Sequence, residues 1–230
     1  MASRFILLLL TIVATLSEVK SENWALPVAL GQFPFIAIIR YSNGPVAIGA
    51  LIARRLVLGS AAHMFRRPVS IMIQLGCISV RNCYTPQIPV SEDYDETYPT
   101  LIIFRLMAEA ELSDTIRIIP FAPPRDYSNL MCEYVGLNGR NGIIYWMPVR
   151  LSDRQSCLKK RVNVPENHAC FQDFAPSIIL PDKTLGGSII CGERLVGMMS
   201  MYSVLHKTGP HRMYDLTTNA RQRAGMQRFL

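Results

Sequence analysis

The sequence predicts an all-β protein that ends in a single helix. Seven short apolar runs recur along the 230 residues, and each run has the length of one strand. Turn-forming residues separate the runs, as in Asn43-Gly44 and Asn138-Gly139. Short strands with such turns at regular intervals are typical of a β-barrel or a β-sandwich. The runs cover residues 35–41, 46–52, 70–75, 101–106, 132–137, 187–191 and 195–201.

The predicted helix lies at the end of the chain. Apolar or small side chains recur near a helical period at positions 216, 220, 224 and 230, and a threonine at 217 or 218 can cap the start. We therefore expect a helix over residues 217–229 after the all-β body.

The first residues have the features of a secretory signal peptide. A short positive start at residues 1–4 precedes an apolar stretch at 5–16, and small and polar residues follow. We expect a signal peptide over 1–21 and a secreted, extracellular domain over 22–230. The alternative is a single anchoring helix, but the apolar stretch is short for a membrane span.

Composition favours a globular basic protein with disulfides. Half of the residues are hydrophobic, and the formal net charge is +7. Such a charge favours polyanions such as glycosaminoglycans as partners, whereas the alternative is an ordinary basic surface with no special partner. The six cysteines predict disulfides, although spacing alone leaves the pairing open. Because the sequence has no dense Cys/His cluster, we expect neither a metal nor a cofactor.

Several segments resemble, in order, the trypsin-like serine protease family. Residues 57–63 read Val-Leu-Gly-Ser-Ala-Ala-His, similar to the family's V-L-T-A-A-H. Residues 186–191 read Gly-Gly-Ser-Ile-Ile-Cys, similar to the tail of the family's G-D-S-G-G-P-L-V-C. Further similar segments are residues 31–35, 48–52, 100–106 and 196–200. The resemblance implies two six-stranded antiparallel β-barrels, over roughly 31–120 and 121–215, with a cleft between them and a C-terminal helix.

The resemblance also implies a disulfide framework. Cys132–Cys191 and Cys157–Cys170 match two bonds of the family, and the remaining pair, Cys77–Cys83, would close a small local loop. Two other family bonds are missing, because Ala47 and Met64 occupy one and Pro181 stands at the first position of the other. Each retained bond is expected to stabilise the fold by roughly 2–4 kcal/mol.

The catalytic positions implied by the resemblance are His63, Thr100 and Leu185. Hydrolysis needs a hydroxyl nucleophile, a histidine that accepts its proton, and a carboxylate that orients the histidine. Leucine has no lone pair to attack a carbonyl, and threonine cannot stabilise imidazolium by charge. We therefore expect a degenerate serine endopeptidase homologue without activity, in which His63 is a remnant rather than a base or a ligand. The alternative nucleophile is Ser188, three positions further on.

Other functional positions of the family are altered as well. The oxyanion-hole glycine position is Lys183, and the aspartate that pairs with the new N-terminus after activation is replaced by Thr184. No activation-like R-I-V-G-G segment precedes residue 31, so we predict no activating cleavage. The specificity pocket maps to Ile179, Met201 and Tyr202, which offer no counter-charge for a basic side chain.

The remaining charged and aromatic residues allow a simpler interpretation. We expect the histidines at 168, 206 and 211 at scattered polar surface positions, and the tryptophans at 24 and 146 in packing roles. The basic groups are either ordinary solvated charges or parts of a polyanion-binding face. These groups lie at residues 54–55, 66–67, 159–161 and 221–223.

Three functions follow as hypotheses. The first is a secreted, non-catalytic homologue of the insect type that binds a protease, an inhibitor or another homologue as a binding or regulatory module. The second is a cryptic serine-type endopeptidase with a displaced nucleophile. The third is a basic extracellular protein that binds polyanions. We expect neither nucleic acid as a partner nor a membrane span.

Overall fold

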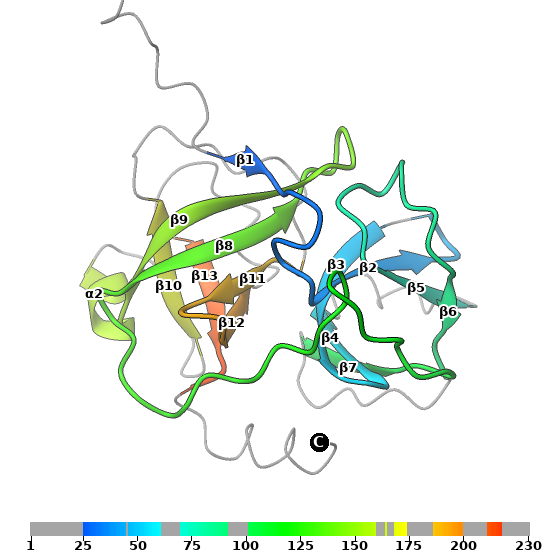
Figure 1. Cartoon of the computed structure of the whole chain (residues 1–230). Helices are drawn as coiled ribbons and strands as arrows, with labels where there is room; N and C mark the ends of the chain where they lie inside the picture. The colour runs from blue at the N-terminus through cyan, green and yellow to red at the C-terminus, as the bar shows by residue number, and fades with distance from the viewer. Residues whose placement is uncertain are drawn as a thin grey trace, which may run out of the picture.

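The computed structural model describes residues 25–44, 46–60, 70–91, 101–159, 164, 168–173, 186–199 and 211–217. These residues form two antiparallel sheets that lie side by side (Figure 1). The N-terminal half contains β2 (Ile36–Tyr41), β3 (Val46–Ala53), β4 (Leu56–Ser60), β5 (Ile71–Leu75), β6 (Ile88–Pro89) and β7 (Leu101–Arg105). The C-terminal half contains β8 (Met131–Leu137), β9 (Ile144–Ser152), α2 (Arg154–Lys159), β10 (His168–Asp173), β11 (Ser188–Ile190), β12 (Leu195–Met199) and β13 (His211–Asp215). The short strand β1 (Leu26–Pro27) comes first in the chain.

The first sheet curls into a barrel with the strand order β6-β5-β2-β3-β4-β7. An isolated antiparallel bridge between Val90 and Leu106 joins the chain after β6 to the chain after β7, at the two edges of the sheet. Strand β2 explains why its sequence is almost continuously apolar. Ile39 lies in the core inside this barrel, whereas Ile38 lies in the cluster shared with the other half, so both faces of the strand are buried.

The second sheet is a closed barrel. Strand β8 pairs with both β9 and β11, so the order β9-β10-β13-β12-β11-β8 returns to its start. Large side chains fill its interior, among them Tyr134, Met147, Phe171 and Met213, none more than 1% exposed. Strand β1 adds to the outside of this barrel, where Leu26 pairs with Trp146 of β9. The predicted all-β architecture with two six-stranded barrels is confirmed.

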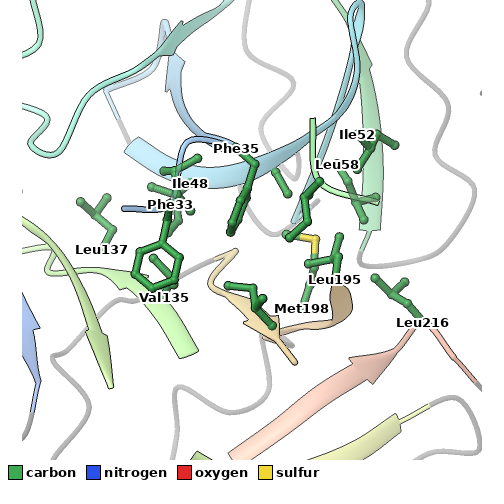
Figure 2. Close-up of a cluster of buried hydrophobic side chains, with 14 of the residues drawn as sticks. Phe33, Phe35, Ile48, Ile52, Leu58, Val135, Leu137, Leu195, Met198 and Leu216 are labelled. Carbon is green, nitrogen blue, oxygen red and sulfur yellow. The ribbon is translucent and has the colours of Figure 1, made fainter. Parts of the chain in front are cut away.

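The two halves meet in one hydrophobic cluster (Figure 2). Phe33, Ile48 and Leu58 contribute from the N-terminal half, and Val135 and Met198 contribute from the C-terminal half. Burial of this apolar surface stabilises the arrangement of the barrels at roughly 25 cal/mol per Å² removed from water. Trp146 packs against the edge of this cluster, 6.2 Å from Phe33 between ring centroids, which agrees with the packing role expected for it.

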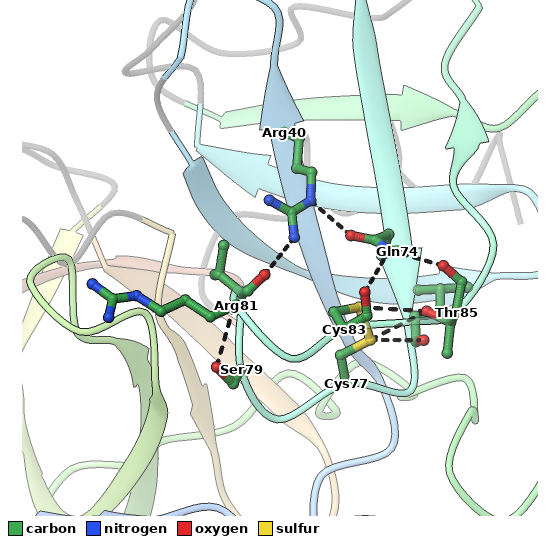
Figure 3. Close-up of a disulfide and its surroundings, with 9 residues drawn as sticks. Arg40, Gln74, Cys77, Ser79, Arg81, Cys83 and Thr85 are labelled. Atoms are coloured by element: carbon green, nitrogen blue, oxygen red, sulfur yellow. Dashed lines mark hydrogen bonds between the residues drawn. A yellow bond between two sulfur atoms is a disulfide. The ribbon is translucent and has the colours of Figure 1, made fainter.

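A small disulfide loop connects the barrels a second time (Figure 3). The Cys77–Cys83 bond closes a loop after β5, and Gln74 donates hydrogen bonds to the carbonyls of Cys83 and Thr85 at 3.3 and 2.8 Å. The loop reaches the β8–β9 turn of the other barrel, where the Val80 N–H donates to the Gly142 carbonyl at 2.7 Å. The covalently closed loop therefore contacts both halves.

Several elements differ from the prediction. Strand β9 was not expected because Pro148 and Arg150 interrupt its apolar pattern, yet it pairs with β8 along its whole length. Helix α2 was also missed, because six residues are too few to show a period. Asp153 caps it by accepting hydrogen bonds from the Ser156 N–H and hydroxyl. The predicted C-terminal helix lies outside the described residues after position 217, and the predicted boundary between the halves stays a prediction.

No helix in the described ranges is both long and apolar enough to cross a membrane.

Candidate functional site

Strands β4 and β7 fix the points where the chain leaves the first barrel toward two of the predicted site positions. Ser60, the last residue of β4, is the register partner of Leu101, the first residue of β7. His63 follows Ser60 by three positions, and Thr100 directly precedes Leu101. Both segments therefore depart from adjacent points on one edge of the sheet, while His63 and Thr100 themselves lie outside the described residues.

The Gly-Gly block of the second barrel lies directly against its neighbours. Gly186 has a left-handed φ of 78°, and a Cβ at this position would overlap the backbone carbonyl of Ile48 in β3. A Cβ on Gly187 would overlap the ring of Tyr134 in β8. Both glycines are thus required by close backbone approaches, whatever the chemistry of Leu185 before them. The contact with Ile48 also brings this part of the chain against the first barrel.

Ser188 is the first residue of β11 and lies in the wall of the closed barrel. It is 0% exposed and pairs with Val135 of β8 and Met198 of β12. Within the described part of the chain, its hydroxyl has no hydrogen-bond partner. A serine hydroxyl in this place has neither solvent access nor a base beside it among those residues.

Most of the positions implied by the family resemblance fall outside the described residues. The structure therefore says nothing of their placement. They are His63, Thr100, Ile179, Lys183, Thr184, Leu185, Met201 and Tyr202, together with Met64 and Pro181 at the missing disulfide positions.

The three disulfides are present as expected. Cys77 bonds to Cys83, Cys132 to Cys191, and Cys157 to Cys170, and no cysteine is free. Cys132–Cys191 ties the start of β8 to the turn after β11, and Cys157–Cys170 ties helix α2 to β10. Ala47, at one of the missing bond positions, is fully buried in the first barrel.

The expectation of surface histidines at 168 and 211 is wrong. His168 is 8% exposed and His211 is 1% exposed, because each occupies an inward position of the adjacent strands β10 and β13. The His168 ring lies 4.1 Å from the Tyr214 ring between centroids, and the His211 ring lies 5.3 Å from Phe171. Sequence alone could not place these rings, since their burial depends on strand register. His206 lies outside the described residues.

Burial changes the chemistry of His168. Its pKa falls to about 4, first because the protonated ring loses hydration and second because the Arg212 guanidinium is near. At neutral pH the imidazole is therefore uncharged, with one nitrogen able to donate and the other able to accept.

A cavity of about 240 Å³ lies beside this histidine. Its polar lining includes the Tyr127 hydroxyl in addition to His168. Sequence reasoning missed it because its lining comes from four separate segments around residues 125–128, 151–154, 168–169 and 213–217, together with Val196.

A wider groove of about 850 Å³ runs along the side of the molecule between the two halves. Phe33 and Arg117 line it from the N-terminal half, and Glu133, Trp146 and Glu193 line it from the C-terminal half. Burial raises the pKa of the Glu133 carboxyl.

The charged groups give no metal site in the part of the chain that is described, since no three His, Cys, Asp or Glu side chains there could hold a metal ion. Arg55 pairs with Glu109 at 3.3 Å between Nε and Oε1, with both side chains more than half exposed, so this basic position behaves as an ordinary solvated charge.

The two barrels and the cluster between them define the fold of the trypsin-like serine proteases. No family model matches the chain, and no curated protein sequence matches it. Solved structures do match, each with 89% of this chain and 96% of the other covered. They are the HL collagenase (TM-score 0.72, 17% identity), human heparin binding protein (0.74, 19%) and scabies mite inactivated protease paralogue S-D1 (0.76, 14%). Identities this low establish a shared fold.

Proposed function

We propose that this protein is a secreted, non-catalytic homologue of trypsin-like serine proteases that acts as a protein-binding or regulatory module. The observation that carries the proposal is Leu185, directly before a Gly-Gly block that has the family's form. An aliphatic side chain at the nucleophile position cannot form an acyl-enzyme. The glycines after it have a packing role against Ile48 and Tyr134, so their presence does not require catalysis.

The alternative of a cryptic peptidase requires another nucleophile close to Leu185. Ser188 is the nearest serine in the sequence, and its complete burial in β11 argues against that role. Attack on a peptide would require this strand to leave the barrel. The fold shared with a scabies mite inactivated protease paralogue supports the view that this architecture persists without activity.

The partner is proposed to be an extracellular protein: a protease, an inhibitor or another homologue. The groove between the halves supports a binding role, because it offers a concave surface with apolar and charged lining. Phe33 and Trp146 supply aromatic surface, and Glu133 and Glu193 supply carboxylates that have no ion-pair partner among the described residues. Secretion is supported by the three disulfides, which form in oxidising compartments.

A fluorophosphonate probe tests the loss of catalysis, because it labels activated serine hydroxyls. We expect no stoichiometric labelling of the wild-type protein under conditions that label trypsin fully. Ser188→Ala serves as the matched control. Stoichiometric labelling that this substitution abolishes would establish the displaced nucleophile and overturn the proposal.

Affinity capture from the native secretion tests the binding role. The immobilised protein should retain a defined partner that an unrelated protein of matched net charge does not retain. Retention of the same set of proteins by both would show that net charge alone explains the binding.

A second candidate function is polyanion binding. It is favoured by the net charge of +7 and by the fold shared with human heparin binding protein. A dedicated site should delay elution from immobilised heparin to a higher salt concentration than a charge-matched unrelated protein requires. Elution at the same salt concentration would count against such a site.

A further inference from the structure

We propose that the cavity beside Tyr127 and His168 binds a small hydroxylated amine, a function separate from any binding at the former protease cleft. The cavity lies in the C-terminal half, at the side of the closed barrel where β9, β10 and β13 meet the segment before β8. Its volume of about 240 Å³ exceeds many times the space that one ordered water needs.

Two buried polar side chains in this cavity have no hydrogen-bond partner. Tyr127 is 5% exposed and His168 is 8% exposed, so each is more than nine-tenths buried. Within the described residues, neither the Tyr127 hydroxyl nor either ring nitrogen of His168 has a partner. A buried polar group without a partner is strongly unfavourable, and such groups in folded proteins bond to water or to a ligand. Three unsatisfied atoms on one cavity therefore point to a polar occupant.

The chemistry of these atoms specifies a hydroxyl group. The uncharged imidazole of His168 donates at one nitrogen and accepts at the other, and the phenol of Tyr127 can do both. A ligand hydroxyl also donates and accepts, so it can bond to both side chains at once. A carboxylate could only accept, and an ammonium could only donate.

Apolar side chains form the rest of the inner lining. Leu151, Ala169, Val196 and Met213 contribute to it, and the first, third and fourth of these are at most 3% exposed. A ligand that carries a hydroxyl at one end and an apolar or aromatic body behind it would satisfy both parts of the lining. Met213 supplies a polarisable thioether suited to an aromatic ring.

Charged groups on the more exposed part of the lining favour a cation. Three carboxylates, from Asp126, Asp153 and Asp215, stand against the two guanidinium groups of Arg125 and Arg154. The hydroxyl and N–H of Ser128 donate to Asp126, which lowers the pKa of this carboxyl and keeps it ionised. An ammonium group is therefore favoured over a carboxylate at the outer end of the ligand.

The guanidinium groups already have contacts of their own. Arg125 lies 4.6 Å from the centroid of the Tyr127 ring, and the Arg154 Nε donates to the Val164 carbonyl at 3.0 Å. These contacts fix the two cations in place. The inner hydroxyl site, the apolar wall and the acidic outer lining together describe a compact amine with a hydroxyl at the opposite end.

Tyramine is a suitable probe, since it has a phenol, a ring and one ammonium group. Phenethylamine lacks the hydroxyl, and 4-hydroxyphenylacetate carries a carboxylate in place of the ammonium. In calorimetric titrations of the full protein at pH 7.5 and low salt, we expect tyramine to bind with one-to-one stoichiometry. Each analogue should bind roughly tenfold or more weakly, the change expected for one lost hydrogen bond or a reversed charge.

Variants locate the site. Tyr127→Phe removes only the hydroxyl and should weaken tyramine binding roughly tenfold, and His168→Phe should do the same. Tyr84→Phe is the matched control, because Tyr84 is 91% exposed and does not line the cavity, and it should leave binding unchanged. The Tm of ligand-free Tyr127→Phe should equal or exceed that of the wild type, since the hydroxyl it removes is unsatisfied.

Three results would overturn the proposal. The first is no tyramine binding at millimolar concentration, which would leave water as the occupant. The second is equal affinity for all three probes, and the third is unchanged tyramine binding by a folded Tyr127→Phe variant. None of these results bears on labelling by the fluorophosphonate probe, so failure of this proposal and failure of the proposed function are distinguishable.

Discussion

Replacing Gly186 by alanine tests the claim that the Gly-Gly block has a packing role between the barrels. Two costs are expected from the structure. Alanine in the left-handed conformation at φ 78° costs about 1 kcal/mol. The added Cβ also overlaps the Ile48 carbonyl, and forcing an extra carbon into a filled site costs about 1–3 kcal/mol. The total loss of unfolding free energy should be about 3 kcal/mol.

Gly192→Ala is a matched control, because it separates the two costs. Gly192 is also left-handed, with φ 57°, but nothing lies within 4 Å of the Cβ that alanine would add. This variant should lose only the conformational cost, about 1 kcal/mol.

Guanidinium chloride unfolding with the disulfides intact measures both variants, and thermal unfolding gives a second readout. For a domain of this size, Gly186→Ala should lower Tm by roughly 6–12 °C and Gly192→Ala by roughly 2–4 °C. Equal losses in the two variants would refute the reasoning, since the contact between Gly186 and β3 would then contribute nothing.

Two further predictions concern stability. Because the pKa of His168 is about 4 in the folded protein and 6.5 in the unfolded chain, the unfolded state binds more protons between these values. Stability should therefore fall as the pH is lowered from 7 to 4, by about 2–3 kcal/mol from this residue after allowance for solvent screening. His168→Phe should show a shallower fall in chemical unfolding, and the same slope in both proteins would contradict the assignment. Removing the Cys77–Cys83 bond by double alanine substitution should cost about 2 kcal/mol, against about 4 kcal/mol for Cys132–Cys191, because the second bond closes a far longer loop. A larger loss for the short loop, measured by unfolding in guanidinium chloride, would show that its contacts outweigh chain entropy.

Much of the fold could be predicted from the sequence because most strands are marked by local composition. The run at β2 is apolar on both faces, and the alternation of burial toward two different cores follows from strand geometry. Strand β9 has no such mark. Its pairing with β8 and β10 overrides the weak local preference of Pro148 and Arg150, which only the complete sheet can reveal.

The candidate sites were predictable to different degrees. The Gly-Gly block could be found by its resemblance to a family segment, but the reason for the glycines required the position of Ile48. The cavity beside His168 could not be found at all, because no local pattern connects this residue to Tyr127 and no propensity shows that a buried hydroxyl lacks a partner. Burial of His211 likewise follows from its pairing with Phe171 across two strands.

The loop closed by Cys77 and Cys83 bears on how the two halves can move. Its backbone bonds to the β8–β9 turn, from Val80 to Gly142 at 2.7 Å and from Ile144 to Ile78 at 3.0 Å, lie apart from the central hydrophobic cluster. Two separated attachments remove the hinge freedom that a single attachment would leave between the halves. A partner that spans both halves would therefore meet a preformed frame and lose little conformational entropy on docking.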